Sequence, residues 1–304
     1  MGLAEFTEPC SGNVLADTPG YRITFHSGGS SARVLLVTFG TMLSGLENKG
    51  FGTQYASKKG YDHIYVAQAP DSWYQQLSRQ QFSNAVSDLA AKYERVFAYG
   101  SSLGGYAALY FGGVIGAQVV AGSPINWAHP LMSSKEWQHV DFVHEPLLSL
   151  PHQPRPPIVL YDPMRASDRL FVETLVSPAF GGSRIIRLPF SGHAVFVSMR
   201  ENGYLDSFLR NVFEEDVVID LPLEKEGSYI YHLNRAEYFL DQSKTLVAES
   251  QFRESLKCKF NRIAAGRLAR LLSSQKRFSE LDELCDEGFI ALGNTLFMKG
   301  IKRE

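Results

Sequence analysis

The 304-residue sequence predicts an α/β fold: a doubly wound, mostly parallel sheet, followed by a small all-helical C-terminal domain. Short β-branched runs alternate with amphipathic helical stretches along the first two thirds of the chain. Of the 84 residues from Leu221 onward, 26 are charged, against 36 of the 220 before it. Turn residues show the opposite trend, because 13 of 14 prolines and 21 of 26 glycines precede Leu221. We therefore expect a boundary between an α/β domain at 1–220 and a helical tail at 221–304.

Seven runs are predicted as strands because they are short, rich in β-branched side chains and bounded by turn residues. In chain order they are Tyr21–His26, Arg33–Phe39, His63–Gln68, Arg95–Tyr99, Ala117–Ala121, Ile158–Tyr161 and Arg184–Leu188. Residues 34–37 and 158–160 are apolar without interruption. Such runs are typical of strands covered on both faces, which indicates a parallel sheet.

Two apolar stripes at helical spacing predict helices in the same part of the chain. The first contains Phe82, Ala85, Val86, Leu89, Ala90 and Tyr93. The second runs from Val195 to Val212 and predicts one helix after His193. Strands that alternate with helices favour the doubly wound arrangement.

Residues 123–157 separate two predicted core strands and are expected to form a cap or lid. The segment holds seven prolines, four histidines and two tryptophans, and a connection of this length is usually functional. Trp127 lies in it, while Trp73 and Tyr74 follow an earlier strand. Because aromatic rings beside a nucleophile suit acyl chains or sugar faces, these three residues are candidate substrate contacts. Simple packing of the same rings is an equally weighted alternative.

The tail, residues 228–293, is expected to form three helices. One stripe runs from Phe252 to Leu272, and another begins at Phe278 after the turn 273–276. This hairpin is similar to one of tetratricopeptide type, although Leu281 stands where a small residue is usual. A lone hairpin needs a neighbour, so we expect the tail to pack on the first domain, bind a protein partner or pair with a second copy.

A nucleophile motif follows the strand Arg95–Tyr99. Gly100-Ser101-Ser102-Leu103-Gly104 reads G-x-S-x-G, and a good helix start comes directly after it. A serine at the tip of so tight a turn is strained, and side chains at Gly100 or Gly104 would collide with each other or with neighbouring backbone. Ser102 is therefore the predicted nucleophile, although a Gly/Ser-rich loop that only turns the chain would read similarly.

A base and an acid must activate a serine hydroxyl, and both are found later in the chain. His193 follows the last predicted strand on a short glycine-containing loop. Two carboxylates, Asp162 and Asp168, follow the strand before it. We favour Asp168 as the acid because its loop can fold back, whereas Asp162 next to Pro163 could instead brace the turn. The acid would orient the imidazole and stabilise its charged form.

An oxyanion hole requires two amides. One is the amide after the nucleophile, that of Leu103. The other is expected in the loop Gly40–Leu43 after the strand Arg33–Phe39, at Thr41 or, as second choice, Met42.

Composition and charge exclude several functional classes. A net charge of −2 gives nucleic acid no electrostatic footprint, and no apolar run is long enough to span a membrane. The seven histidines other than His193 lack metal-ligand spacing, and the three cysteines lack CxxC spacing, so we expect no metal. The N-terminus lacks signal-peptide features, which makes the cytoplasm the expected compartment.

The motif Gly100–Gly105, the carboxylates after residue 161 and Ser191-Gly192-His193 together resemble the α/β-hydrolase superfamily over roughly residues 21–215. The segments 51–52, 59–62, 71–75 and 104–110 are similar to a poorly characterised bacterial branch that occurs near cell-surface glycan assembly functions. The resemblance implies a Ser-Asp-His triad and no cofactor. Phe39-Gly40-Thr41 replaces the HGGG oxyanion motif of lipases, which argues against large lipid substrates.

These observations predict a serine hydrolase that cleaves an ester or thioester of a small metabolite or a glycan through an acyl-enzyme. The same triad could pass the acyl group to an acceptor alcohol, which would make the protein an acyltransferase. A rival hypothesis is a non-catalytic adaptor that acts through its helical tail.

Overall fold

The computed structural model describes residues 12–29, 33–151, 153–221 and 227–292. Eight strands form one sheet in the order β1-β2-β4-β3-β5-β6-β7-β8. The strands are β1 (Asn13–Asp17), β2 (Tyr21–His26), β3 (Val34–Phe39), β4 (Asp62–Gln68), β5 (Arg95–Ser101), β6 (Gln118–Gly122), β7 (Ile158–Tyr161) and β8 (Arg184–Arg187). The β1–β2 and β2–β4 pairs are antiparallel and all the others are parallel. The predicted fold class, a doubly wound, mostly parallel sheet with a helical C-terminal region, is confirmed.

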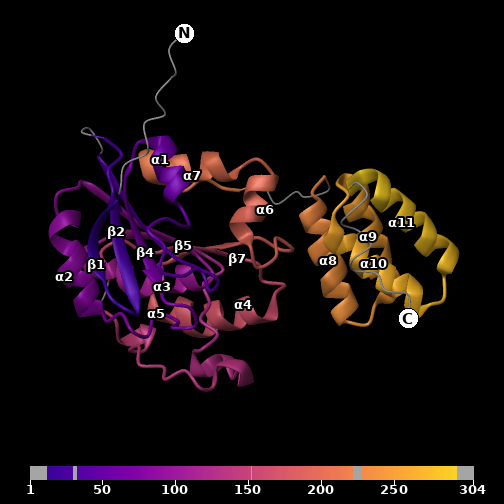
Figure 1. Ribbon diagram of the computed structural model, residues 1–304, viewed down its shortest axis with the longest axis horizontal. Helices are drawn as coiled ribbons and strands as arrows, with labels where there is room; N and C mark the ends of the chain where they lie inside the picture. The colour runs from indigo at the N-terminus through magenta and orange to yellow at the C-terminus, as the bar shows by residue number, and fades with distance from the viewer. Residues whose placement is uncertain (1–11, 30–32, 152, 222–226, 293–304) are drawn as a thin grey trace, which may run out of the picture.

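Helices cover both faces of this sheet (Figure 1). They are α1 (Thr53–Lys59), α2 (Arg79–Ala90), α3 (Leu103–Gly112), α4 (Ala166–Phe171), α5 (Ser177–Ala179), α6 (Val195–Glu201) and α7 (Leu205–Glu214). A 3₁₀ turn, Gly113–Ile115, follows α3, and a π turn, Val172–Val176, joins α4 to α5. One buried apolar cluster lies under α2, α3 and the cap, and a second lies under α1, α6 and α7. The two clusters bury both faces of the sheet, as the continuously apolar strands predicted.

The two edges of the sheet are short. At one edge β1 contains a register shift between Val14 and Ala16. At the other, β8 has an arginine at each end: Arg184 lies 3.2 Å from Asp220, and Arg187 lies 3.9 Å from Glu173. Only one of the five residues of β1, Val14, is β-branched, which explains why the sequence did not predict it as a strand.

The stripe from Val195 to Val212 forms two helices, so the prediction of one is wrong. Helix α6 ends at Glu201, and Gly203 adopts φ +79° before α7 begins at Leu205. A helix cannot continue through a left-handed residue, and the apolar spacing on each side of the break happens to stay in phase.

The cap, residues 123–157, contains three 3₁₀ turns: Pro130–Met132, Lys135–Trp137 and Leu147–Ser149. His144 fixes it to α3, because its Nδ1 lies 2.9 Å from the Tyr106 hydroxyl, and to the segment between β4 and α2, because its Nε2 lies 2.9 Å from the Tyr74 carbonyl. The imidazole also stacks on Tyr110 at 4.0 Å. Burial lowers the pKa of His144 to about 4, so the ring is neutral at neutral pH.

The tail contains four described helices, not the three predicted for residues 228–293: α8 (Tyr229–Asp241), α9 (Thr245–Cys258), α10 (Arg262–Ser274) and α11 (Phe278–Leu292). The stripe from Phe252 to Leu272 is divided because Lys259 is extended and Asn261 caps α10, accepting a hydrogen bond from the Ala264 amide at 2.9 Å. The expected domain boundary runs into residues 222–226, which lie outside the described residues.

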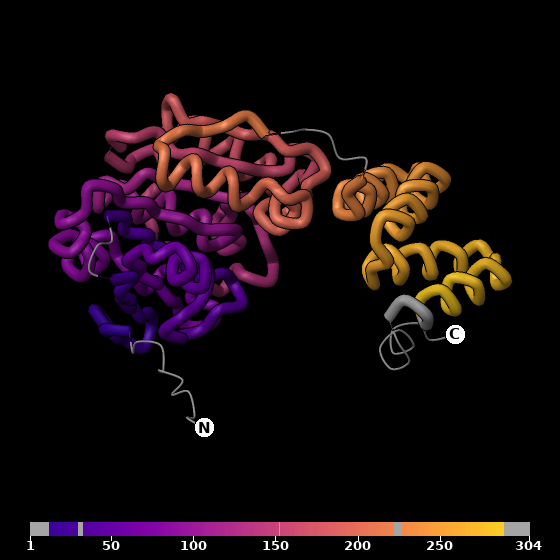
Figure 2. The backbone as a smooth tube through the Cα atoms, turned by 90° about the horizontal axis from the view of Figure 1, so that it is seen from above, coloured from indigo at the N-terminus to yellow at the C-terminus, as the bar shows by residue number. Residues whose placement is uncertain are grey.

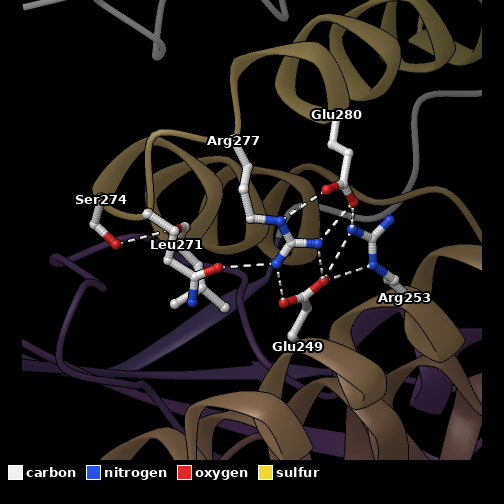
Figure 3. Close-up of polar contacts among 7 residues, drawn as sticks. Glu249, Arg253, Leu271, Ser274, Arg277 and Glu280 are labelled. Atoms are coloured by element: carbon white, nitrogen blue, oxygen red, sulfur yellow. Dashed lines mark hydrogen bonds and ion pairs between the residues drawn. The ribbon is translucent and has the colours of Figure 1, made fainter.

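The tail has its own buried cluster, centred on Phe252, Leu268 and Leu272. An ion-pair network links α9 to α11 (Figure 3). Arg277 donates to Glu249 at 2.6 Å and to Glu280 at 2.7 Å, and Arg253 donates to the same two carboxylates. We call the part of the chain that contains the sheet, residues 12–221, the front part. In both overall views the tail lies beside the front part, with α8 nearest to it (Figures 1 and 2).

Candidate active site

Ser102 lies at a sharp turn between β5 and α3. Its backbone adopts φ 56° and ψ −123°, a conformation that costs a non-glycine residue about 1–3 kcal/mol. A Cβ at Gly100 would lie 2.0 Å from the Gly104 carbonyl oxygen, and one at Gly104 would lie 2.6 Å from that of Phe39. The steric role predicted for the two glycines is confirmed. The turn leaves the Ser102 side chain partly exposed at the carboxyl end of β5.

Ser102, His193 and Asp168 form a chain of hydrogen bonds. The His193 Nε2 lies 2.8 Å from the Ser102 Oγ, and its Nδ1 lies 3.0 Å from each Asp168 carboxylate oxygen. Because an ionised carboxylate only accepts, Nδ1 carries the proton and Nε2 accepts from the serine hydroxyl. The Asp168 side chain is 1% exposed and that of His193 is 34% exposed. The three residues therefore have the geometry of a nucleophile, a base and an orienting acid.

Asp162, the second choice for the acid, has different partners. Its carboxylate accepts hydrogen bonds from the amides of Met164 at 2.8 Å, Phe190 at 3.0 Å and Gly192 at 2.8 Å. Burial raises the pKa of Asp162, although the three amides oppose this shift. Two of its partners belong to the loop that carries His193, so Asp162 braces the loop and Asp168 contacts the imidazole.

The two predicted oxyanion amides lie on segments that pack together. Leu103 is the first residue of α3, where an amide has no acceptor within the helix. A Cβ at Gly104 would come within 3.1 Å of the Gly40 carbonyl oxygen, so the start of α3 lies against the loop after β3. The Tyr74 hydroxyl donates to that Gly40 carbonyl at 3.1 Å. Since the N–H of a trans peptide points opposite to its carbonyl, this contact orients the Thr41 amide.

The predicted substrate contacts differ in exposure. Trp73 and Tyr74 are each 1% exposed, and the Trp73 ring packs on Trp137 of the cap at 4.7 Å. Trp127 is half-buried and packs against the buried apolar cluster under α2, α3 and the cap. Buried rings do not line an open pocket, so the burial of Trp73 and Tyr74 favours the packing alternative for these two residues. Both have positive φ, 52° and 62°, which the sequence did not reveal.

The sequence did not predict the neighbours of the loop that carries His193, residues 188–194, which we call the histidine loop. Phe190 contacts Tyr231 and Tyr238 of α8, and Gly192 lies against Asn234 of the same helix. The only available signal was the spacing of 231, 234 and 238, which places them on one helical face. Nothing in the sequence indicated what this face would contact.

Within the described part of the chain, no group of three or more His, Cys, Asp or Glu side chains is arranged to hold a metal ion. None of the described helices combines the length and the apolar character needed to cross a membrane.

No known family model and no curated protein matches the sequence. Similar solved structures include an α/β hydrolase from a sediment metagenome of the Mar Chica lagoon, Morocco, at 15% identity and a TM-score of 0.40, covering 64% of this chain and 95% of that one. Dienelactone hydrolase from Anabaena variabilis is similar at 15% identity and 0.40, covering 66% and 93%. A probable hydrolytic enzyme from Pseudomonas aeruginosa is similar at 12% and 0.42, covering 63% and 90%. The fold assignment rests on the strand order and pairing described above.

Proposed function

We propose that this protein is a serine hydrolase that cleaves an ester or thioester through an acyl-enzyme. The observation that carries the proposal is the chain of hydrogen bonds from Ser102 through His193 to Asp168. The chain lies at the carboxyl end of a parallel sheet, where this class of fold carries its nucleophile.

In the first step the Ser102 Oγ attacks the acyl carbon while His193 Nε2 takes the hydroxyl proton. The carbonyl oxygen becomes an oxyanion, which the amides of Leu103 and Thr41 stabilise. When the intermediate collapses, the bond to the leaving alcohol or thiol breaks and His193 returns the proton to it. Asp168 holds the imidazole and stabilises its charged form throughout.

In the second step a water molecule attacks the acyl-enzyme, again losing a proton to His193 Nε2. Collapse releases a carboxylic acid and restores the Ser102 hydroxyl. An acceptor alcohol in place of water would complete an acyl transfer with the same residues and the same proton movements. Substrates of the expected class are small acylated metabolites and acylated glycans, and a screen of p-nitrophenyl esters, acetylated sugars and acyl thioesters distinguishes among them.

A fluorophosphonate probe tests the nucleophile directly. We expect covalent labelling of Ser102, detected by mass spectrometry of the peptide, and loss of labelling in Ser102→Ala and His193→Ala. Ser101→Ala is the matched control, because Ser101 is the neighbouring, partly exposed serine and should leave labelling intact. Labelling that persists in Ser102→Ala would contradict the assignment of Ser102, and a folded wild-type protein that takes no label would favour the adaptor hypothesis.

A further inference from the structure

The loop that carries His193 has left-handed backbone at two positions, and at one of them, Phe190, the residue is not a glycine. Phe190 adopts φ 60° and Gly192 adopts φ 73°. A left-handed phenylalanine is rare and persists only where its surroundings hold it in place. Asp162 holds the loop from one side through the amides of Phe190 and Gly192.

Helix α8 of the tail holds the same loop from the other side. The Phe190 ring meets Tyr231 edge to face at 5.4 Å and 88°, and Tyr238 at 5.6 Å and 72°. A Cβ at Gly192 would lie 2.7 Å from the Asn234 side chain, so this side chain lies directly against the loop backbone. The three α8 residues share one helical face.

The opposite face of α8 anchors it in the tail. Leu233 and Ala236 are buried in the tail cluster with Ala248 and Phe252 of α9. A separate contact, the ion pair between Lys259 and Glu201 at 2.9 Å, joins the tail to α6 without touching the histidine loop. Helix α8 is thus a support that is fixed independently of the loop.

We infer that α8 positions His193, with Tyr231, Asn234 and Tyr238 as positioning residues for the proposed catalytic histidine. This inference rests on the proposed function. Without the two tyrosine rings, Phe190 loses the contacts that oppose its strain and the loop relaxes. A shift of about 1 Å at a catalytic group can cost about 100-fold in rate, and His193 is three residues from Phe190.

The test uses the full-length protein with Tyr231→Leu/Tyr238→Leu. We expect kcat for a p-nitrophenyl ester and the rate of fluorophosphonate labelling to fall together, by about 10- to 100-fold, with KM within twofold. Tyr231→Phe/Tyr238→Phe should restore both rates, because it keeps the rings. Lys259→Met is the matched control: it breaks the ion pair between the tail and Glu201 of α6, which lies outside the histidine loop, and should leave both rates unchanged.

Phe190→Leu removes the contact with Tyr231 and Tyr238 from the side of the loop. It keeps the inference testable if the tyrosine double variant folds poorly. Combined with Tyr238→Leu in a double-mutant cycle, it should reduce kcat by less than the product of the two single effects. Unchanged kcat in the tyrosine-to-leucine variant, or effects that multiply independently in the cycle, would overturn the role of α8. Labelling that persists in Ser102→Ala would instead overturn the proposed function, so the two failures are distinguishable.

Discussion

Two buried carboxylates follow β7, and their partners assign them different tasks. Asp168 accepts from an imidazole and Asp162 accepts from three amides. Replacing either removes a negative charge, but only one replacement affects the backbone of the histidine loop. Activity and stability should therefore respond differently at the two positions.

We expect Asp168→Asn to lower kcat by about 10³- to 10⁴-fold, because an amide in place of the carboxylate favours the wrong imidazole tautomer. The melting temperature should change by no more than a few degrees, since His193 keeps a partner of the same shape. Steady-state kinetics and a thermal melt provide the two measurements. Retention of most of the activity would contradict the assignment of Asp168.

Asp162→Asn should lower both kcat and the melting temperature. The amide offers only one acceptor oxygen, so its NH₂ group faces the amide of either Gly192 or Phe190 and leaves that donor buried and unpaired, at a cost of about 1–3 kcal/mol. Chemical denaturation measures the loss in stability. If Asp162→Asn kept full stability and lost only activity, Asp162 would have a direct catalytic task.

The candidate site residues that could be predicted from the sequence are those that belong to local motifs. The glycines around Ser102 and the order serine, acid, histidine are sequence signals with steric and chemical causes. Trp73 and Tyr74 were not predictable, because whether a ring faces a pocket or the core depends on backbone angles that sequence does not encode locally. Both residues have positive φ values, and both rings are buried.

The cap contains a buried, neutral histidine, which makes the stability of the folded protein depend on pH. His144 keeps a pKa of about 4 in the folded protein, against 6.5 for an ordinary histidine. Between these pH values the unfolded chain binds a proton that the folded chain does not. Stability is therefore fully present above pH 6.5 and falls as the pH drops towards 4, by about 1.4 kcal/mol per pH unit. His63, with a pKa lowered to about 3 by burial, adds a similar dependence.

We expect His144→Phe to reduce this pH dependence by about one proton, measured as the slope of the unfolding free energy against pH between 4.5 and 6. The variant should also be less stable at pH 7, because the hydrogen bonds to Tyr106 and Tyr74 are lost. His139→Phe, at an exposed position of the same cap, is the control and should leave the slope unchanged. An unchanged slope in His144→Phe would show that His144 is not the group responsible.

The elements themselves were predicted where burial imposes a pattern and missed where it does not. All seven predicted strands are present, within one or two residues at their ends. Helix breaks at Gly203 and Lys259 were missed because apolar spacing continues across both. A break without a proline leaves little trace in periodicity alone.

Across the whole molecule, three buried clusters divide the protein into a front part with two cores and a tail with one. The sequence indicated this division through charge and turn residues. It could not indicate that the two parts meet at the histidine loop, since that contact joins residues some 40 positions apart in sequence through a few side chains.

The ion-pair network of Arg253, Arg277, Glu249 and Glu280 lies within the tail (Figure 3) and includes none of the residues that contact the histidine loop. Hydrogen bonds from Arg277 hold the pKa of Glu249 below its usual value. We therefore expect Arg277→Met to lower the melting temperature of the tail and to leave fluorophosphonate labelling of Ser102 unchanged. Arg270→Met, an exposed cation on α10, is the control. An equal fall in both variants would mean that the network adds nothing beyond surface charge.

The short outer strands have a consequence for solutions at high concentration. An unpaired strand edge is a template on which another chain can add, and long flat edges lead to aggregation. Here one edge is distorted by the register shift in β1, and the other is only four residues long with an ion-paired arginine at each end. An irregular register and a short, charged edge strand are both features that disfavour the addition of another strand, so neither edge offers a long, flat template for polymerisation.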